Sequence, residues 1–241
     1  MFDIHSHIIY HIDDGSRDME ESVELIRSAV RQGATDIIAT PHYYPECPGD
    51  PVRIKEKLSN IEKAVKNAGI SVRLYAGNEV LYFDSMVERL KNGEILTLAG
   101  SRYTLIEFYP MESYKTILKC VRNIRNAGYL PVIAHAERFR GLRENGLDEI
   151  IGLGAYIQLS TEPIGRKGLS AVFDGETRFV RKALKRKEVH FLGTDMHRSD
   201  TRPPVIADAL KWISNNLDKD YADAILFENA MKMTEDNEID R

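Results

Sequence analysis

The chain has 241 residues, of which 43% are hydrophobic and 29% are charged, and its formal net charge is −4. These are ordinary globular values, and they give no reason to expect nucleic acid or an acidic membrane as a partner. Two cysteines are too few for a disulfide framework, which favours a reducing compartment. The N-terminus is charged where a signal peptide is apolar, and no run approaches 18 apolar residues, so we expect a cytoplasmic protein without membrane insertion.

Short β-branched runs alternate with amphipathic segments along the chain. In the first helix, for example, Met19, Val23, Ile26 and Val30 recur at helical spacing before Gly33. In chain order the predicted elements are strand 3–5, helix 18–32, strand 36–40, helix 52–67, strand 72–76, helix 85–92, strand 104–108, helix 114–126, strand 131–135, helix 147–153, strand 155–159, helix 176–186, strand 189–193, helix 204–216 and helix 221–232. We expect the acidic residues that follow to be frayed.

Seven strand–helix units without a linker-like stretch indicate an α/β fold in which one parallel sheet is covered on both faces. We therefore predict a single domain over 1–241, built as a closed or nearly closed barrel. A doubly wound open sheet is the alternative, but the first strand–helix turn lacks a glycine-rich phosphate loop.

Residues able to ligate metal follow the predicted strand ends. In a β/α barrel the carboxyl ends of all strands converge on one face, so these residues are expected to surround one mouth. Two pairs, His5 with His7 and Asp195 with His197, are spaced so that both members share a face of an extended chain. Glu107 ends an apolar strand, where a carboxylate needs a cation or a hydrogen-bond donor. The full set is His5, His7, His42, Glu79, Glu107, His135, Asp195 and His197.

This ligand set predicts a metal-dependent hydrolase. Imidazoles and carboxylates without thiolate suit Mn, Fe or Zn, and there are more ligands than one ion can use, so two or three ions are implied. Such sites activate a water and clamp the attacking and leaving oxygens at phosphorus or at a carbonyl. Arg138 and Arg202 follow the fifth and seventh strands, and their planar guanidinium groups fit a phosphoryl group, which favours phosphoesters.

A cysteine-based mechanism is the alternative route to phosphate chemistry. The stretch from Cys47 to Arg53 has the C-x5-R spacing of cysteine-dependent tyrosine phosphatases. Pro48 and Pro51 remove two backbone donors from this loop, and Asp50 adds a negative charge to it, so we predict an ordinary surface loop and no cysteine nucleophile.

The remaining histidines are interpreted more simply. His190 lies within a strand and is expected to be a hydrogen-bonded core residue. His11 is a loop residue that is either a ligand or solvated.

The chain strongly resembles the PHP (polymerase and histidinol phosphatase) superfamily. Within it, the chain is most similar to the manganese-dependent tyrosine-protein phosphatases of bacterial capsule and exopolysaccharide loci, the CpsB/YwqE type. The matching stretches are DIHSH at 3–7, DDG at 13–15, IATPH at 38–42, GNE at 77–79, LIEF at 105–108, PVIAHAER at 131–138, DMH at 195–197 and RPP at 202–204.

The resemblance implies a distorted (β/α)7, TIM-like barrel, the PHP domain, and a site for two or three Mn²⁺ ions, with Fe or Zn as alternatives. It also implies three sets of ligands and a phosphate site made by Arg138 and Arg202. The implied sets are His5, His7, Glu79 and Asp195 for the first ion, Glu79, Glu107 and His135 for the second, and Asp14, His42 and His197 for the third.

The implied reaction is hydrolysis of phosphotyrosine by attack of a metal-bound hydroxide, and the implied substrate is the tyrosine-rich tail of a bacterial tyrosine kinase. Glu137 and His11 are the two unassigned candidates for a general acid. Two other functions stay open: a histidinol-phosphate phosphatase of the same superfamily, and a non-catalytic PHP binding module. A module of that kind would be expected to have lost ligands, and none is missing.

Overall fold

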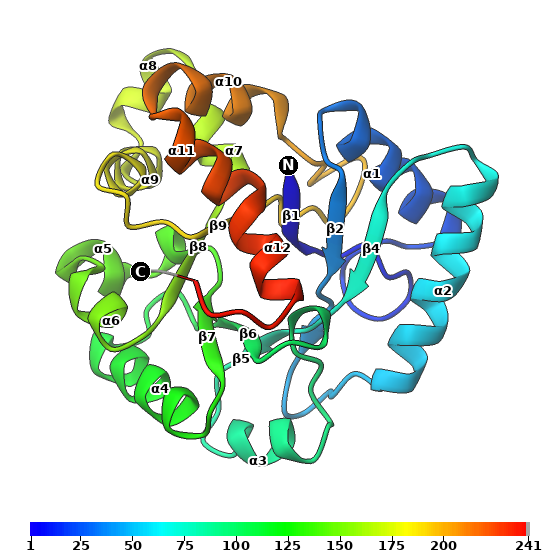
Figure 1. Ribbon diagram of the computed structural model, residues 1–241, viewed down its shortest axis with the longest axis horizontal. Coiled ribbons are helices and arrows are strands. Elements are labelled where there is room, and N and C mark those ends of the chain that lie inside the picture. Colours follow the sequence, from blue (N-terminus) through cyan, green and yellow to red (C-terminus); the bar gives the residue numbers. More distant parts are fainter. Residues whose placement is uncertain (240–241) are drawn as a thin grey trace.

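A ring of short parallel strands forms the centre of the molecule (Figure 1). The structure is a computed structural model that describes residues 1–239. Its strands are β1 (Phe2–Ser6), β2 (Asp36–Ala39), β3 (His42–Tyr43), β4 (Arg73–Ala76), β5 (Glu79–Leu81), β6 (Tyr103–Glu107), β7 (Leu130–Ile133), β8 (Tyr156–Ser160) and β9 (Phe191–Gly193).

The strands pair as β1-β2-β4 and as β3-β5-β6-β7-β8-β9. Strands β2 and β3 are the two halves of one longer strand, and β4 and β5 are the halves of its neighbour. The pairing continues across both gaps, where Gly77 N–H donates to Ala39 O at 2.9 Å. The ring closes beyond β9, where Asp195 N–H donates to His5 O at 2.8 Å and His7 N–H donates to Met196 O at 2.8 Å. The curled sheet is therefore the distorted seven-stranded barrel that the sequence predicts.

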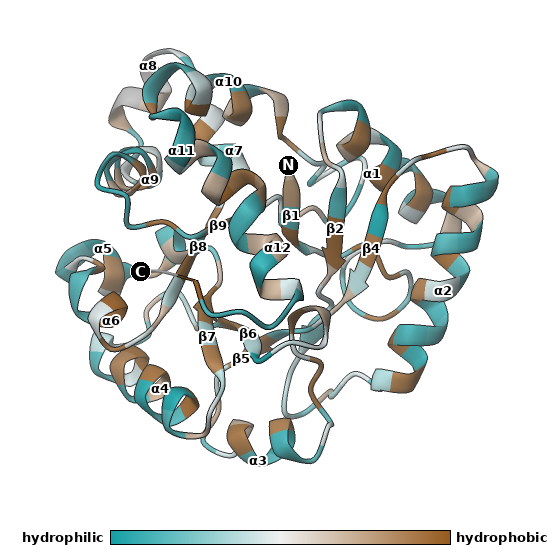
Figure 2. Ribbon diagram, viewed as in Figure 1, coloured by the Kyte–Doolittle hydropathy of each residue, from teal (hydrophilic) through white to brown (hydrophobic). Residues whose placement is uncertain are grey.

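Helices cover the outside of the ring and turn their polar faces to solvent (Figure 2). The α-helices are α1 (Met19–Arg31), α2 (Pro51–Asn67), α3 (Met86–Lys91), α4 (Tyr114–Asn126), α5 (Arg140–Asn145), α6 (Asp148–Gly152), α7 (Thr161–Gly165), α8 (Gly168–Phe173), α9 (Gly175–Lys185), α10 (Ala207–Asn216), α11 (Lys219–Asp223) and α12 (Asn229–Thr234). Shorter turns are η1 (Leu98–Gly100), η2 (Ala136–Arg138) and the π-helical η3 (Ala224–Glu228), which joins α11 to α12.

The long helices lie where the sequence predicts them. Asp18 caps α1 by accepting from Glu21 N–H at 2.8 Å, and α4 spans the predicted residues. Helices α5, α7 and α8 were not predicted, because segments of five or six residues are too short to show helical periodicity. The helix predicted from residue 204 begins at Ala207.

The expectation of a frayed C-terminal tail is wrong for the described residues. Ile239 is 4% exposed and packs with α12 against Tyr103 and Tyr156 inside the ring. The Tyr103 hydroxyl donates to Asn237 O at 2.9 Å and accepts from Ile239 N–H at 3.1 Å. The tail and α12 therefore plug the ring with apolar and hydrogen-bonded contacts. Among residues 1–239, no helix is both long and apolar enough to cross a membrane.

Candidate metal centre

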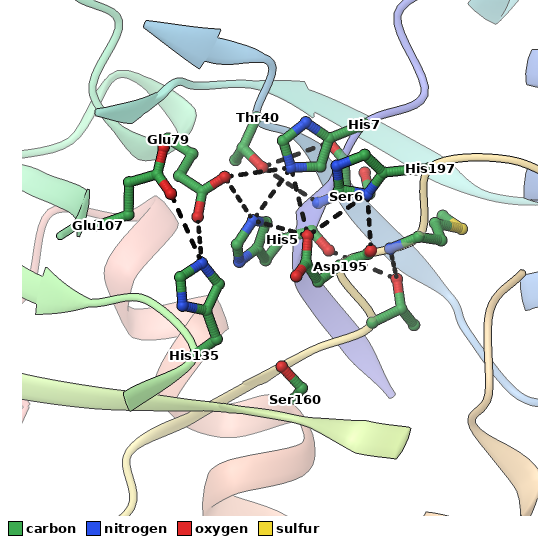
Figure 3. Close-up of polar contacts among 12 residues, drawn as sticks. His5, Ser6, His7, Thr40, Glu79, Glu107, His135, Ser160, Asp195 and His197 are labelled. Atoms are coloured by element: carbon green, nitrogen blue, oxygen red, sulfur yellow. Dashed lines mark hydrogen bonds and ion pairs between the residues drawn. The ribbon is translucent and has the colours of Figure 1, made fainter. Parts of the chain in front are cut away.

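The structure brings all nine predicted ligand side chains together at the carboxyl ends of the strands. Figure 3 shows all of them except Asp14 and His42. They come from β1 and the loop after it, from β3, β5 and β6, and from the loops after β7 and β9. Asp14 lies in the loop after β1 and is the most exposed of them, with its side chain 68% exposed. The other eight are His5, His7, His42, Glu79, Glu107, His135, Asp195 and His197, which are buried or nearly so.

Four buried side chains form the inner group: His5, His7, Glu79 and Asp195. Glu79 Oε2 lies 3.2 Å from Nε2 of both histidines. Asp195 Oδ1 lies 3.3 Å from His5 Nε2 and 3.4 Å from His7 Nε2. Two nitrogens and two carboxylate oxygens therefore face one common point.

Glu79 also belongs to a second group with Glu107, His135 and His42. His135 Nε2 lies 2.6 Å from Glu79 Oε1 and 3.9 Å from Glu107 Oε2. His42 Nδ1 lies 3.0 Å from Glu79 Oε2 and 3.0 Å from Glu107 Oε1. His42 thus faces this group as well as the next one, a sharing that the sequence does not predict.

The third group lies toward solvent. Asp14 Oδ1 is 3.6 Å from Nε2 of both His42 and His197. The His197 ring stacks on that of His7 with centroids 3.8 Å apart, which joins this group to the inner one.

The residues present fit divalent cations. Glu79 Oε2, Glu107 Oε1 and His42 Nδ1 are buried and lie close to other ligand atoms, but none of the three makes a hydrogen bond of good geometry. Buried polar atoms without a partner are costly, and carboxylate oxygens and imidazole nitrogens aimed at the same points are the ligands of Mn, Fe and Zn. The unpaired atoms are therefore those that a cation would satisfy.

The close packing of these ionisable side chains shifts their pKa values. Burial lowers the pKa of His7, but Asp13 and Glu79 outweigh it and raise the pKa to about 9. His42 also has its pKa raised to about 9, because Glu107 and Glu79 outweigh the burial. Burial opposes ionisation of Glu79, yet His5 and His135 hold its pKa well below the usual range. Burial lowers the pKa of His135 instead, so the histidines of the centre do not all favour the charged form.

Two supporting residues were not predicted from the sequence. Asp13 Oδ2 lies 2.8 Å from His7 Nδ1 and accepts from His42 N–H at 2.9 Å. Gln158 Oε1 accepts from His135 N–H at 2.7 Å and lies 3.1 Å from His5 Nδ1. Both fix the far nitrogen of a histidine and so orient the near one. A signal for Gln158 was available, since an amide inside the apolar strand β8 needs partners as Glu107 does.

The backbone of the metal centre is unusual at two ligand positions and closely packed at two glycines. His135 has φ 28° and Asp195 has φ 53°, in the left-handed region that residues with a Cβ rarely adopt. A Cβ on Gly15 would lie 2.2 Å from His7 O, and one on Gly193 would lie 2.5 Å from His5 Cβ. These glycines let neighbouring backbone pack directly against the two histidines of the inner group.

The two predicted arginines converge on Asp195. Arg138 Nη2 lies 2.7 Å from Asp195 Oδ2, and Arg202 Nη2 donates to the same oxygen. Burial and the neighbouring Arg138 lower the pKa of Arg202 to about 10. Two guanidinium groups therefore meet beside the inner metal-ligand group.

Beside the arginines is a hollow of about 330 Å³ with a polar lining. Glu137 lies in its wall, fully buried, and accepts from Ser160 N–H at 3.2 Å. A larger hollow of about 700 Å³ is lined by α2 and β4, and the residues that line it include none of the nine ligands.

The other candidates from the sequence lie outside the three groups. His11 is exposed in a loop. His190 Nδ1 accepts from Ile157 N–H at 3.1 Å, which confirms a hydrogen-bonded core residue. Cys47 is exposed, and Asp50 caps α2 by accepting from Val52 N–H at 2.9 Å. The carboxylate of Asp50 occupies the helix N-terminus, where a phosphate would have to bind.

Comparison with known proteins identifies the family of the chain. The family described as "Capsular polysaccharide synthesis, CpsB/CapC" matches residues 1–235. The tyrosine-protein phosphatase CpsB of Streptococcus agalactiae is 34% identical over 247 residues, covering 99% of this chain and 100% of the relative. The tyrosine-protein phosphatase YwqE of Bacillus subtilis is 31% identical over 206 residues, covering 84% of this chain and 79% of the relative.

A solved structure is similar over the whole chain. It comes from work on YwqE of Bacillus subtilis and CpsB of Streptococcus pneumoniae, described as unique metal-dependent tyrosine phosphatases. The TM-score is 0.90 at 28% identity, covering 100% of this chain and 97% of the other.

Proposed function

The chain belongs to the CpsB/CapC family of capsular polysaccharide synthesis, and on that basis we propose that it is a metal-dependent tyrosine-protein phosphatase. The observation that carries this proposal is the convergence of nine His, Asp and Glu side chains with two arginines at one end of the barrel. A phosphatase that uses metal ions needs both elements, ligands for the ions and cations for the phosphate.

The proposed metal is Mn²⁺, with two or three ions per chain. One ion would be held by His5, His7, Glu79 and Asp195. A second would be held by Glu79, Glu107 and His135, and a third by Asp14, His42 and His197. The distances within the three groups support this division, and Glu79 would bridge the first two ions. Ions in such a site supply an activated water and a clamp for the attacking and leaving oxygens.

The residues of the chain orient the substrate. Arg138 and Arg202 would bind the phosphoryl oxygens, since their guanidinium groups already meet at a carboxylate oxygen of Asp195. Glu137 is buried against Ser160 N–H and His11 is exposed in a loop, so neither presents an obvious general acid. A phenolate has a pKa near 10 and leaves more readily than an alkoxide, so an aryl phosphate suits a site without such an acid.

The proposed physiological substrate is a phosphotyrosine protein of capsule synthesis, namely the tyrosine-rich tail of a bacterial tyrosine kinase in the cytoplasm. The names of the relatives support a phosphotyrosine substrate and a role in capsule synthesis. The alternative within the same superfamily, histidinol phosphate, would use the same metals and arginines. A non-catalytic module is disfavoured, because all nine candidate ligands are present.

The test compares substrates under one metal condition. Chelator-treated protein should lose phosphatase activity and regain it with Mn²⁺. With Mn²⁺ present, kcat/KM should be higher for a phosphotyrosine peptide than for the matched phosphoserine peptide or histidinol phosphate. Full activity after exhaustive metal removal would contradict metal dependence, and a preference for histidinol phosphate would reassign the enzyme.

A further inference from the structure

A second pocket opens beside the metal centre, and none of the residues that line it also lines the hollow beside the arginines. Its volume is about 420 Å³, and it lies between the loop after β3 and the loop after β6, over the end of β5. The residues that line it include Tyr44, Cys47, Leu81, Glu107, Tyr109 and Pro110.

This pocket is continuous with the metal centre. Glu107 lies in its wall and also faces His42 in the second ligand group at 3.0 Å. The ring of Tyr44 stacks on the ring of His42, with centroids 4.9 Å apart and planes inclined by 22°. A molecule held at the centre can therefore extend into the pocket without leaving the protein surface.

The position of the arginines indicates how a bound phosphate ester would be oriented. Both guanidinium groups contact Asp195. Figure 3 shows Asp195 and Glu107 on different sides of Glu79 and His5. A phosphate whose free oxygens contact the arginines can therefore place its ester oxygen on the side of Glu107, where the pocket begins.

The lining of this pocket suits an aromatic ring better than the hollow beside the arginines does. Tyr44, Tyr109 and Pro110 present rings, and Leu81 presents an apolar side chain. The hollow beside the arginines is lined instead by charged groups that include Glu137, Arg166 and Glu176. Tyr109 is 64% exposed, so its ring has unburied surface with which to cover a ligand.

We propose that this pocket is the subsite for the aromatic ring of the substrate, with Tyr44 and Tyr109 as the residues that select aryl over alkyl phosphates. The inference rests on the proposed phosphatase function and adds the residues that recognise the leaving group. Tyr109 acts on binding of the ring, so its removal raises KM more than it lowers kcat.

The main test is Tyr109→Ala, with Met111→Ala as the matched control. Met111 is 69% exposed on the same loop and does not line the pocket, so both variants remove a large exposed side chain. With Mn²⁺, Tyr109→Ala should lower kcat/KM for a phosphotyrosine peptide about three- to tenfold, the scale of one aromatic pair. The matched phosphoserine peptide should change less than twofold, and Met111→Ala should leave both near wild type.

A binding measurement gives the same answer without turnover. Phenylphosphonate and methylphosphonate differ only in carrying a phenyl or a methyl group on phosphorus, so the ratio of their dissociation constants reports binding of the ring. Tyr109→Ala should reduce this ratio about three- to tenfold. Tyr44→Leu should reduce it as well, and because Tyr44 stacks on His42, the Mn²⁺ content of that variant must be measured alongside.

The outcomes separate this inference from the proposed function. The ring subsite would be overturned if Tyr109→Ala lowered kcat/KM equally for the phosphotyrosine and phosphoserine peptides, or if it left the ratio of the two phosphonate dissociation constants unchanged. Either result would leave the proposed phosphatase activity in place. Val205 lines the hollow beside the arginines. If Val205→Ala, and not Tyr109→Ala, changed the ratio of the phosphonate dissociation constants, the ring would be assigned to that hollow. Wild-type protein without activity on any aryl phosphate would overturn the proposed function itself.

Discussion

His5 Nδ1 and Gln158 Oε1 lie 3.1 Å apart in the buried floor of the metal centre. The same amide oxygen accepts from His135 N–H at 2.7 Å, so Oε1 is the acceptor and His5 Nδ1 carries the proton. His5 therefore points its other ring nitrogen, Nε2, toward Glu79 and Asp195. Gln158 on β8 thus fixes the ring orientation of His5 on β1 and holds the backbone N–H of His135 after β7.

We expect Gln158→Leu to weaken metal binding, because it removes both hydrogen bonds from these two ligands. Loss of such a supporting partner costs about 10- to 100-fold in metal affinity. Titration of the metal-free protein with Mn²⁺ by calorimetry measures the change. Gln158→Glu keeps an acceptor at this position and should retain most of the affinity. Unchanged affinity in Gln158→Leu would mean that Gln158 does not orient His5.

Arg138→Ala and Arg202→Ala should each lower kcat/KM for aryl phosphates by about two orders of magnitude, as expected when a preorganised charge is removed. Metal content should persist, since both guanidinium groups contact Asp195 through Oδ2 and the inner group uses Oδ1. Kinetics paired with metal analysis of each variant checks this. Loss of metal in step with activity would show that the arginines support the ligand rather than the phosphate.

Cys47→Ser should leave turnover near wild type. Asp50 already satisfies Val52 N–H at the start of α2, so the loop offers no anion cradle for a thiolate mechanism. A nucleophile replaced in this way loses about a thousandfold or more. The measurement is kcat with Mn²⁺ at saturating substrate. An inactive variant that still binds its metal would restore the cysteine mechanism.

Glu21 gives a pH-dependent contribution to stability that does not involve the metal ligands. Arg17 holds the pKa of Glu21 down to about 2, with help from Ser199, whose N–H donates at 3.1 Å. A lowered carboxyl pKa stabilises the fold above the ordinary value near 4.5, and the contribution is lost as pH falls from there toward 2.

Glu21→Gln should therefore lower the free energy of unfolding by about 2 kcal/mol at pH 7, the scale of charged hydrogen bonds. The deficit should shrink below pH 4.5. Urea unfolding of both proteins between pH 7 and 3.5 measures it, and Glu20→Gln on the exposed face of α1 is the matched control. A deficit that is constant across this range would rule out the ionised carboxylate as its source.

Gly193→Ala should destabilise the protein by roughly 1–3 kcal/mol, the usual cost of overpacking. The added Cβ would lie 2.5 Å from His5 Cβ, so β9 or His5 must move. Gly175→Ala is the control, because a Cβ there meets no atom within 4 Å. Thermal unfolding of the metal-free proteins compares the two. Equal stability would show that the backbone adjusts without strain.

Much of the site could be predicted because a parallel barrel gathers strand ends. His5, Glu107 and Asp195 were found by their place after apolar runs, and the structure brings them together. The contact of His42 with two ligand groups was not predicted, because it depends on side-chain direction at a strand of two residues. Gln158 was missed although an amide inside an apolar strand needs partners, because a single such residue has no spacing pattern that names those partners.

The same limit explains the missed parts of the fold. Helix α7 has five residues and includes Pro163, so it presents neither a period nor a uniform propensity. The tail beyond α12 is acidic and was expected to fray. Its packing is decided by the hydroxyl groups of Tyr103 and Tyr156, which lie more than 80 residues away in the chain. Long-range partners of this kind are not visible in a local pattern.

The hydrogen bonds that join Asp195 and Met196 to β1 also constrain the order of assembly. The inner ligand group takes His5 and His7 from the first strand, and Asp195 from beyond the last. A nascent chain that has emerged only as far as β8 lacks Asp195 and His197 and cannot complete this group. We therefore expect chains that end before Asp195 to bind metal only weakly at the inner group.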